Sequence, residues 1–144
     1  MKYKLRLDLK KVFNGIQLYQ IEALIDIPKY GINKGQLGGF IEKESNLSQQ
    51  DNAWVYGDAQ VYGNSHVFGD ALVYGDAQVS DNACVFGDAQ VYDNAQVFGN
   101  ARVYDNAWVY GNAQVSDNAL VSGNAQVSDN ALVSGNACVS KFGE

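Results

Sequence analysis

The chain has 144 residues, about the size of one domain, and a formal net charge of −6. Residues 1–46 hold eight basic and five acidic residues (+3), whereas residues 47–144 hold two and eleven (−9), which argues against a nucleic-acid polymer as partner. We see no cleavable signal peptide, membrane-spanning run or disulfide framework, and we therefore expect a cytoplasmic protein that binds no membrane.

Residues 1–36 predict a β-hairpin that covers one end of the fold. Apolar and mostly charged residues alternate from the start of the chain, which is typical of a half-buried strand. The apolar face of this strand carries Tyr3, Leu5, Leu7 and Leu9. The sequence "FNGI" at residues 13–16 is a hairpin-turn signal, and "IQLYQIEALIDI" follows as the second apolar segment until Pro28 breaks the pattern.

A six-residue repeat occupies most of the remaining chain. Valine stands at every sixth position from Val55 to Val139, fifteen times, with alanine or once serine two places earlier. Each unit supplies four extended residues and a Gly/Asp/Asn pair that suits a tight corner. Alternate side chains of a strand share a face, so alanine and valine point inward, and the residues beside them point outward.

The units "VYGDAQ", "VFGDAL" and "VSDNAC" resemble the hexapeptide repeat of left-handed parallel β-helices. This resemblance implies an all-β, triangular solenoid with three hexads, or eighteen residues, in each coil. The lead-in "LGGFIEKESNLSQQDNAWVYGDA" is also similar to bacterial and phage hexapeptide proteins described as polymer-forming. In this register Ile41 and Leu47 begin the first two hexads, and two extra residues follow near Gln49.

These features predict three regions. A hairpin cap spans residues 1–36, the β-helix spans 37–140, and a short tail spans 141–144, where Phe142 is placed to plug the last coil. An uncovered end of a solenoid exposes its core and its unpaired strand edges. We therefore expect the hairpin to cap the N-terminal end, while the other end either pairs with another molecule or is protected by its polar coils.

Eighteen-residue coils would sort the outward side chains into three walls. The first wall carries the column Trp54, Leu72, Gln90, Trp108 and Gln126, beside a column of Tyr56, Tyr74, Tyr92 and Tyr110. The second wall carries Gln60, Gln78, Gln96, Gln114 and Leu132, and the third carries His66, Cys84, Arg102, Leu120 and Cys138. We expect the glutamine amides of the second wall to hydrogen-bond along the stack.

The first wall is the candidate interface or ligand-binding surface. Its candidate residues are Trp54, Tyr56, Leu72, Tyr74, Tyr92, Trp108 and Tyr110. They would form an apolar patch of roughly 300 Å², near the size at which exposed apolar surface marks an interaction site. Two alternatives stay open, namely that the aromatic rings only stiffen the solenoid, or that the N-terminal hairpin folds over them.

Catalytic and metal chemistry receive little support. His66 is the only histidine, so the three histidines of β-helical carbonic anhydrases are absent, and no cofactor or metal is predicted. His66 and Cys84 fall on adjacent rungs, so a nucleophilic pair or an acyltransferase base is geometrically conceivable. However, a flat wall offers no pocket, and Cys84 and Cys138 lie three coils apart, too far for a disulfide.

The sequence therefore predicts a non-enzymatic β-helical scaffold that self-associates, as a dimer or trimer, through its aromatic face. The resemblance suggests a phage or mobile-element setting. The alternative function is an anti-defence factor or binding protein whose partner is a host protein or a small planar, nucleotide-like ligand held between subunits. An acyltransferase-like enzyme is the third hypothesis.

Overall fold

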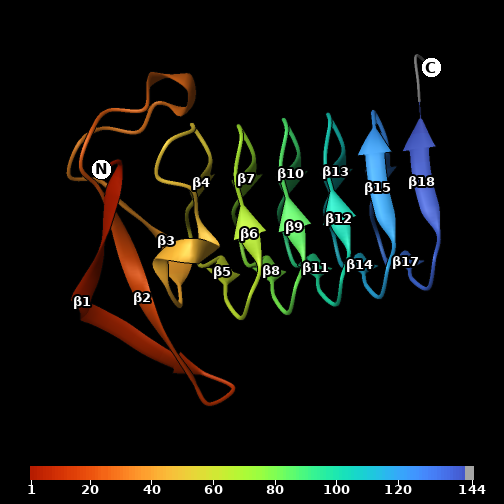
Figure 1. Cartoon of the computed structure of the whole chain (residues 1–144), viewed down its shortest axis with the longest axis horizontal. Coiled ribbons are helices and arrows are strands. Elements are labelled where there is room, and N and C mark those ends of the chain that lie inside the picture. Colours follow the sequence, from red (N-terminus) through yellow and green to blue (C-terminus); the bar gives the residue numbers. More distant parts are fainter. Residues whose placement is uncertain (142–144) are drawn as a thin grey trace.

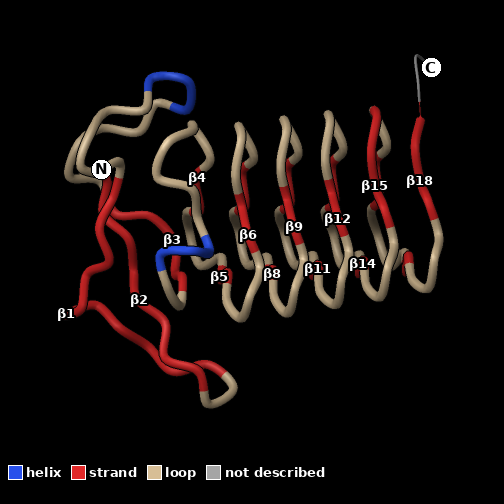
Figure 2. The backbone as a smooth tube through the Cα atoms, in the orientation of Figure 1, coloured by secondary structure: helices blue, strands red, loops and turns tan. Residues whose placement is uncertain are grey.

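The computed structural model describes residues 1–141, and the predicted plug, Phe142, lies outside the described residues together with residues 143 and 144. Coils of similar size stack along the long axis of the molecule, and a hairpin covers the N-terminal end (Figure 1). The tube view shows strands joined by corners and loops (Figure 2), and the helices of residues 1–141 are two short 3-10 turns. The predicted all-β solenoid is confirmed.

The elements before the repeat are β1 (Tyr3–Phe13), β2 (Ile16–Ala23), η1 (Pro28–Tyr30), β3 (Leu37–Ile41) and η2 (Glu44–Asn46). The repeat forms β4 (Trp54–Val55), β5 (Gln60–Val61), β6 (His66–Val67), β7 (Leu72–Val73), β8 (Gln78–Val79), β9 (Cys84–Val85), β10 (Gln90–Val91), β11 (Gln96–Val97), β12 (Arg102–Val103), β13 (Trp108–Val109), β14 (Gln114–Val115), β15 (Leu120–Gly123), β16 (Gln126–Val127), β17 (Leu132–Val133) and β18 (Cys138–Lys141).

Every third strand of the repeat joins the same parallel sheet. Gln60 pairs with Gln78, Leu72 with Gln90, and Cys84 with Arg102, each eighteen residues further along the chain. The first wall is thus the sheet β4-β7-β10-β13-β16, and the third is β6-β9-β12-β15-β18. The sorting of outward residues into three walls is confirmed, and the left-handed winding stays a prediction.

Alanine and valine stand two places apart in the extended part of each hexad, so their side chains share one face of the strand. That face points into the solenoid, and the two residues fill its interior. The inward alanines from Ala53 to Ala119 and valines from Val55 to Val121 are fully buried. Ser65 replaces alanine once, and its hydroxyl donates to the carbonyl oxygen of Tyr62 inside the corner at 2.7 Å. Small and β-branched side chains of nearly constant volume allow identical coils to stack without gaps.

The corners alternate between glycine and aspartate from Gly75 onward. Their backbone is left-handed, with φ of 66° at Gly99 and 58° at Asp81. Each coil has three corners, an odd number. Corners that stack directly on one another, eighteen residues apart, therefore also alternate between glycine and aspartate. The Asp81 carboxylate accepts a hydrogen bond from Gly99 N at 2.9 Å, and a Cβ added at Gly99 would lie 2.7 Å from Asp117 N. Aspartate therefore ties each coil to the next, and glycine leaves the space for the following aspartate.

The N-terminal region continues the second-wall sheet in the order β1-β2-β3-β5. The turn has positive φ at Asn14 (51°) and Gly15 (79°), as the hairpin signal predicts. Ile41 pairs with Val61 and Leu47 bridges Val67, a spacing of twenty residues that confirms the two extra residues in the first coil.

One expectation for the hairpin is wrong. Leu7 does not share the buried face of Tyr3, because its side chain is 68 % exposed. The pairing of β1 with β2 shifts between Arg6 and Lys10, and such a bulge breaks the alternation of faces. Beyond the bulge, Phe13 contacts Tyr62 edge-on at 6.0 Å between ring centroids.

The first residues of the chain lie over the first coil. Tyr3 is fully buried and donates its hydroxyl to the carbonyl oxygen of Leu47 at 2.6 Å. Lys2 Nζ donates to the carbonyl oxygens of Asp51 at 2.9 Å and Ala53 at 2.6 Å. These contacts satisfy backbone acceptors that the first coil would otherwise leave open.

Candidate functional site

The first wall presents one outward side chain from each coil beside a ladder of tyrosine rings. Tyr56, Tyr74, Tyr92 and Tyr110 stack in parallel with 4.8 to 5.0 Å between successive ring centroids. This distance is the spacing of neighbouring strands, so the rings stack because the coils do. The predicted stacking is confirmed.

The chain itself covers the N-terminal half of the first wall. Trp54 is fully buried and meets the Tyr3 ring edge-on at 6.3 Å. Leu72 is only 6 % exposed. Neither side chain is accessible to a partner, so the open alternative, that the N-terminal region folds over the wall, holds for these two coils.

The segment that reaches onto this wall is residues 27–32, here called the strap. Its ends are joined by backbone hydrogen bonds between Ile27 and Ile32, which are both buried. Tyr30 packs against the core and donates its hydroxyl to the carbonyl oxygen of Asp70. Lys29 Nζ pairs with Asp70 at 3.1 Å and with Asp88 at 3.7 Å, so one cation bridges two stacked corner carboxylates.

The C-terminal half of the wall is open. Trp108 is 37 % exposed and meets the Tyr92 ring edge-on at 6.4 Å. It is flanked by glutamines one coil before and one coil after, and each of these receives a hydrogen bond from a tyrosine hydroxyl. Tyr74 Oη donates to Gln90 Oε1 at 3.2 Å, and Tyr110 Oη donates to Gln126 Oε1 at 3.4 Å.

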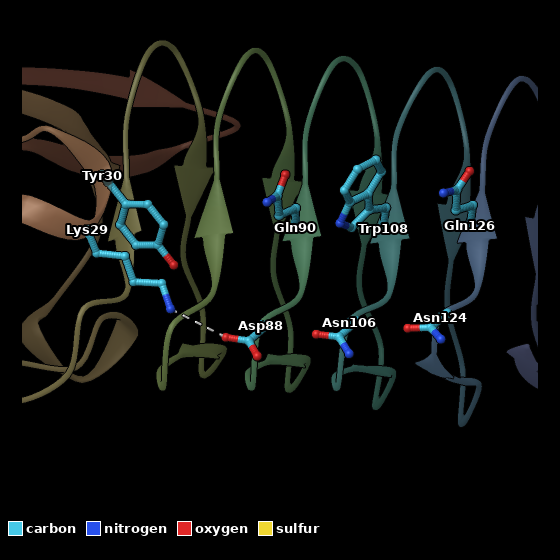
Figure 3. A pocket seen from close by; sticks show the side chains of 8 residues that line it. All are labelled: Lys29, Tyr30, Asp88, Gln90, Asn106, Trp108, Asn124 and Gln126. Carbon is cyan, nitrogen blue, oxygen red and sulfur yellow. Dashed lines mark ion pairs between the residues drawn. The ribbon is translucent and has the colours of Figure 1, made fainter. Parts of the chain in front are cut away.

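A hollow of about 470 Å³ lies at the step between the strap and the open wall (Figure 3). It is lined by Lys29, Tyr30, Asp88, Gln90, Asn106, Trp108, Asn124 and Gln126. The sequence predicts Trp108 but not Lys29 or Tyr30, because nothing in the strap's own sequence indicates which wall it covers. The stacked aspartates at residues 70 and 88 are the one signal that a cation lies nearby.

Burial and hydrogen bonding shift the pKa of two groups on the first wall near the hollow. Burial is the main cause that raises the pKa of Tyr74, to about 12, so its hydroxyl remains a hydrogen-bond donor. The hydrogen bond from Lys29 is the main cause that lowers the pKa of Asp70. The hollow therefore combines an indole face, two amides whose oxygens accept tyrosine hydroxyls, and a lysine that bridges two carboxylates, a cluster with a net charge of −1.

The third wall places the residues of the conceivable nucleophilic pair on adjacent rungs, as expected. His66 Nδ1 lies 2.7 Å from the carbonyl oxygen of Ser45, which fixes the ring against the wall. Burial raises the pKa of Cys84 and so disfavours the thiolate that a nucleophile requires. A hollow of about 450 Å³ adjoins Cys84 and Arg102, but His66 does not line it. Both cysteines, Cys84 and Cys138, are free thiols.

The expected glutamine ladder on the second wall is wrong at its first member. Gln60 Oε1 is buried without a hydrogen-bond partner. An amide ladder forms instead at a corner, where Asn100 donates to Asn118 at 3.3 Å and Asn118 to Asn136 at 3.4 Å. The shorter side chain holds its amide close to the backbone, so amides one coil apart can meet.

Residues 1–141 bring together no group of three or more His, Cys, Asp and Glu side chains that could hold a metal ion. None of the helices in this range has the length and hydrophobicity that a membrane crossing requires.

A family model described as "YdcK Beta solenoid repeat" matches residues 77–93, 95–111, 113–125 and 125–141. Together these segments cover less than half of the chain. No curated protein matches the chain. The matched segments each have about the length of one eighteen-residue coil or somewhat less, which agrees with the strand pairing. The repeats and the stacked parallel coils together identify the chain as a β-solenoid repeat protein.

Proposed function

We propose that this β-solenoid is a non-enzymatic scaffold that self-associates through the open part of the first wall. The observation that carries the proposal is Trp108, an indole 37 % exposed beside the last two rings of the tyrosine ladder. Tryptophan and tyrosine are enriched where protein surfaces meet, because they bury much apolar area with little loss of conformational freedom.

The second and third walls are weaker candidates. The second wall interrupts its aromatic residues with Ser80 and presents mainly glutamines. The third has a stack of Phe68, Phe86 and Tyr104, but its neighbouring column mixes histidine, cysteine and arginine. Only the first wall combines an exposed tryptophan with an adjoining hollow and an unbroken tyrosine ladder.

Substitution of Trp108 by glutamine tests this proposal cleanly. Glutamine already occupies the same column at Gln90 and Gln126, so the coil tolerates it. Leu132→Gln is the matched control, since Leu132 is 71 % exposed on the second wall and continues the Gln114 column. Light scattering after size exclusion should show an oligomer for the wild type and Leu132→Gln, and a smaller species for Trp108→Gln. A monomeric wild type, or an oligomer that Trp108→Gln leaves intact, would contradict the proposal.

The hollow favours a second candidate, a small planar ligand stacked on the indole of Trp108. Gln90 and Gln126 would supply hydrogen bonds at its edges. Titration of the protein with uncharged nucleosides should then quench the fluorescence of Trp108, whereas the buried Trp54 reports no change. Unchanged fluorescence across the panel would exclude this candidate.

A further inference from the structure

We infer that two copies pack their first walls face to face with their solenoid axes antiparallel, so that the Gln90 coil of one copy faces the Gln126 coil of the other. This inference rests on the proposed self-association and names its partner and geometry. Two flat walls that are related by a two-fold axis and whose solenoid axes are aligned can meet in two ways. The solenoid axes run either in the same direction or in opposite directions.

The strap makes the two arrangements unequal. It lies on the wall beside Leu72 and leaves the coils of Gln90, Trp108 and Gln126 open. With parallel axes every coil would face its own equivalent, so the two straps would meet and hold the open coils apart. With antiparallel axes centred on Trp108, the two straps would instead lie at opposite ends of the contact and would not meet.

Charge favours the same arrangement. Residues 1–46 carry +3 and residues 47–144 carry −9. Parallel axes would place the two basic N-terminal regions side by side and the two acidic repeats side by side. Antiparallel axes would place each basic region near the C-terminal coils of the other copy, where residues 93–144 carry −3, within the range at which charges interact in moderate salt.

The local pattern of the wall is self-complementary under this rotation. Gln90 and Gln126 lie one coil on either side of Trp108, and each has its amide oxygen held by a tyrosine of its own wall. Facing walls would then stack indole on indole and bring each Gln90 amide to a Gln126 amide. The free amide N–H groups of one copy can donate to the remaining lone pairs of the other.

The contact is small, and its strength follows from its size. Three coils at a spacing of about 4.8 Å give a strip about 14 Å long, well below the area of a standard interface. We therefore expect a dimer that dissociates on dilution. Because long-range attraction between unlike ends contributes, raising the salt concentration should also weaken it.

Engineered disulfides distinguish the two arrangements. The starting chain is Cys84→Ser/Cys138→Ser, which removes both native thiols. Gln90→Cys and Gln126→Cys are then made in separate chains, one of which bears a size tag, and are oxidised singly and mixed. We expect a covalent heterodimer in the mixture that is at least fivefold more abundant than homodimers in either single sample. Homodimers from the single variants would establish parallel axes and overturn the inference.

Two controls separate the failure of this inference from the failure of the proposed function. Gln78→Cys mixed with Gln114→Cys has the same two-coil spacing on the second wall and should give no covalent dimer. Sedimentation of the unoxidised variants reports whether they associate at all. A monomer throughout would contradict self-association itself, whereas a dimer without the 90–126 disulfide would contradict only the antiparallel geometry.

Discussion

Trp54 and Trp108 occupy the same column of the same wall, three coils apart, yet Trp54 is fully buried and Trp108 is 37 % exposed. Their places in the hexad are identical, so the local fold gives both side chains the same direction. The difference arises from Tyr3 and the strap, which lie over the first coils and leave the later coils open. Position in the repeat therefore sets orientation, while distant residues decide which part of the wall is accessible.

Truncation of the two tryptophans should give the largest difference in the free energy of unfolding between the covered and the open coils. Trp54→Ala removes a fully buried ring from beneath Tyr3 and should lower the free energy of unfolding by roughly 3–5 kcal/mol. Trp108→Ala removes a partly exposed ring and should cost less than about 1 kcal/mol in the monomer. Urea unfolding at low protein concentration measures both. Equal losses would show that the N-terminal region does not cover Trp54.

A second pair of substitutions compares a covered corner with an open one. Gly99 and Gly135 both have positive φ (66° and 63°), but an added Cβ would meet the next coil only at Gly99. Gly135→Ala should cost about 1 kcal/mol from left-handed strain alone, and Gly99→Ala about 2–3 kcal/mol.

Thermal or urea unfolding of the two variants provides the measurement. An equal cost at both glycines would contradict the account of the alternating corners. Asp81→Asn is a further check, since it keeps the shape but weakens the bond to Gly99 N.

The covered region should also give stability a dependence on pH. Burial lowers the pKa of Lys2 to about 8, so between pH 8 and 10.5 the unfolded chain binds more protons than the folded chain. Stability should therefore rise over that window, by on the order of 2 kcal/mol. Burial also raises the pKa of Tyr3 and, to about 12, that of Tyr74, so stability should fall again above pH 10 as the unfolded chain loses phenol protons first.

Urea unfolding between pH 7 and 11.5 measures both limbs of this profile. Lys2→Met should remove the rise below pH 10 and leave the fall above it. If the free energy of unfolding of the wild type did not rise between pH 8 and 10, Lys2 would not be buried as a charged group against the first coil.

Within the repeat, the sequence predicts nearly every side-chain direction. The two-residue period of a strand decides that the alanines point inward and that Trp108 and Cys84 point outward. The eighteen-residue length of a coil decides on which wall each outward side chain lies. The fold class, the coil stacking and the tyrosine ladder follow from the same two numbers. Repetition makes this possible, because each coil contacts only its neighbours.

Outside the repeat, long-range contacts decide the structure and the sequence says less. Leu7 is exposed because of a bulge in the pairing of β1 with β2, which no alternation pattern reveals. Lys29 and Tyr30 reach Asp70 across about forty residues, so their part in the hollow is visible only in the folded chain. The Gly/Asp alternation is plain in the sequence. Its role, a hydrogen bond that an aspartate carboxylate accepts from a glycine N–H of the next coil, can be recognised only once residues eighteen apart are known to stack.

Sedimentation equilibrium of the wild type and Trp108→Gln over a concentration series tests the central claim most directly. If the open half of the first wall is a self-association surface, the wild-type mass should rise with concentration from 15.7 kDa toward twice that value. Trp108→Gln should stay at 15.7 kDa over the same range. A wild-type mass that stays at the monomer value, or a variant that associates as strongly as the wild type, would contradict the claim.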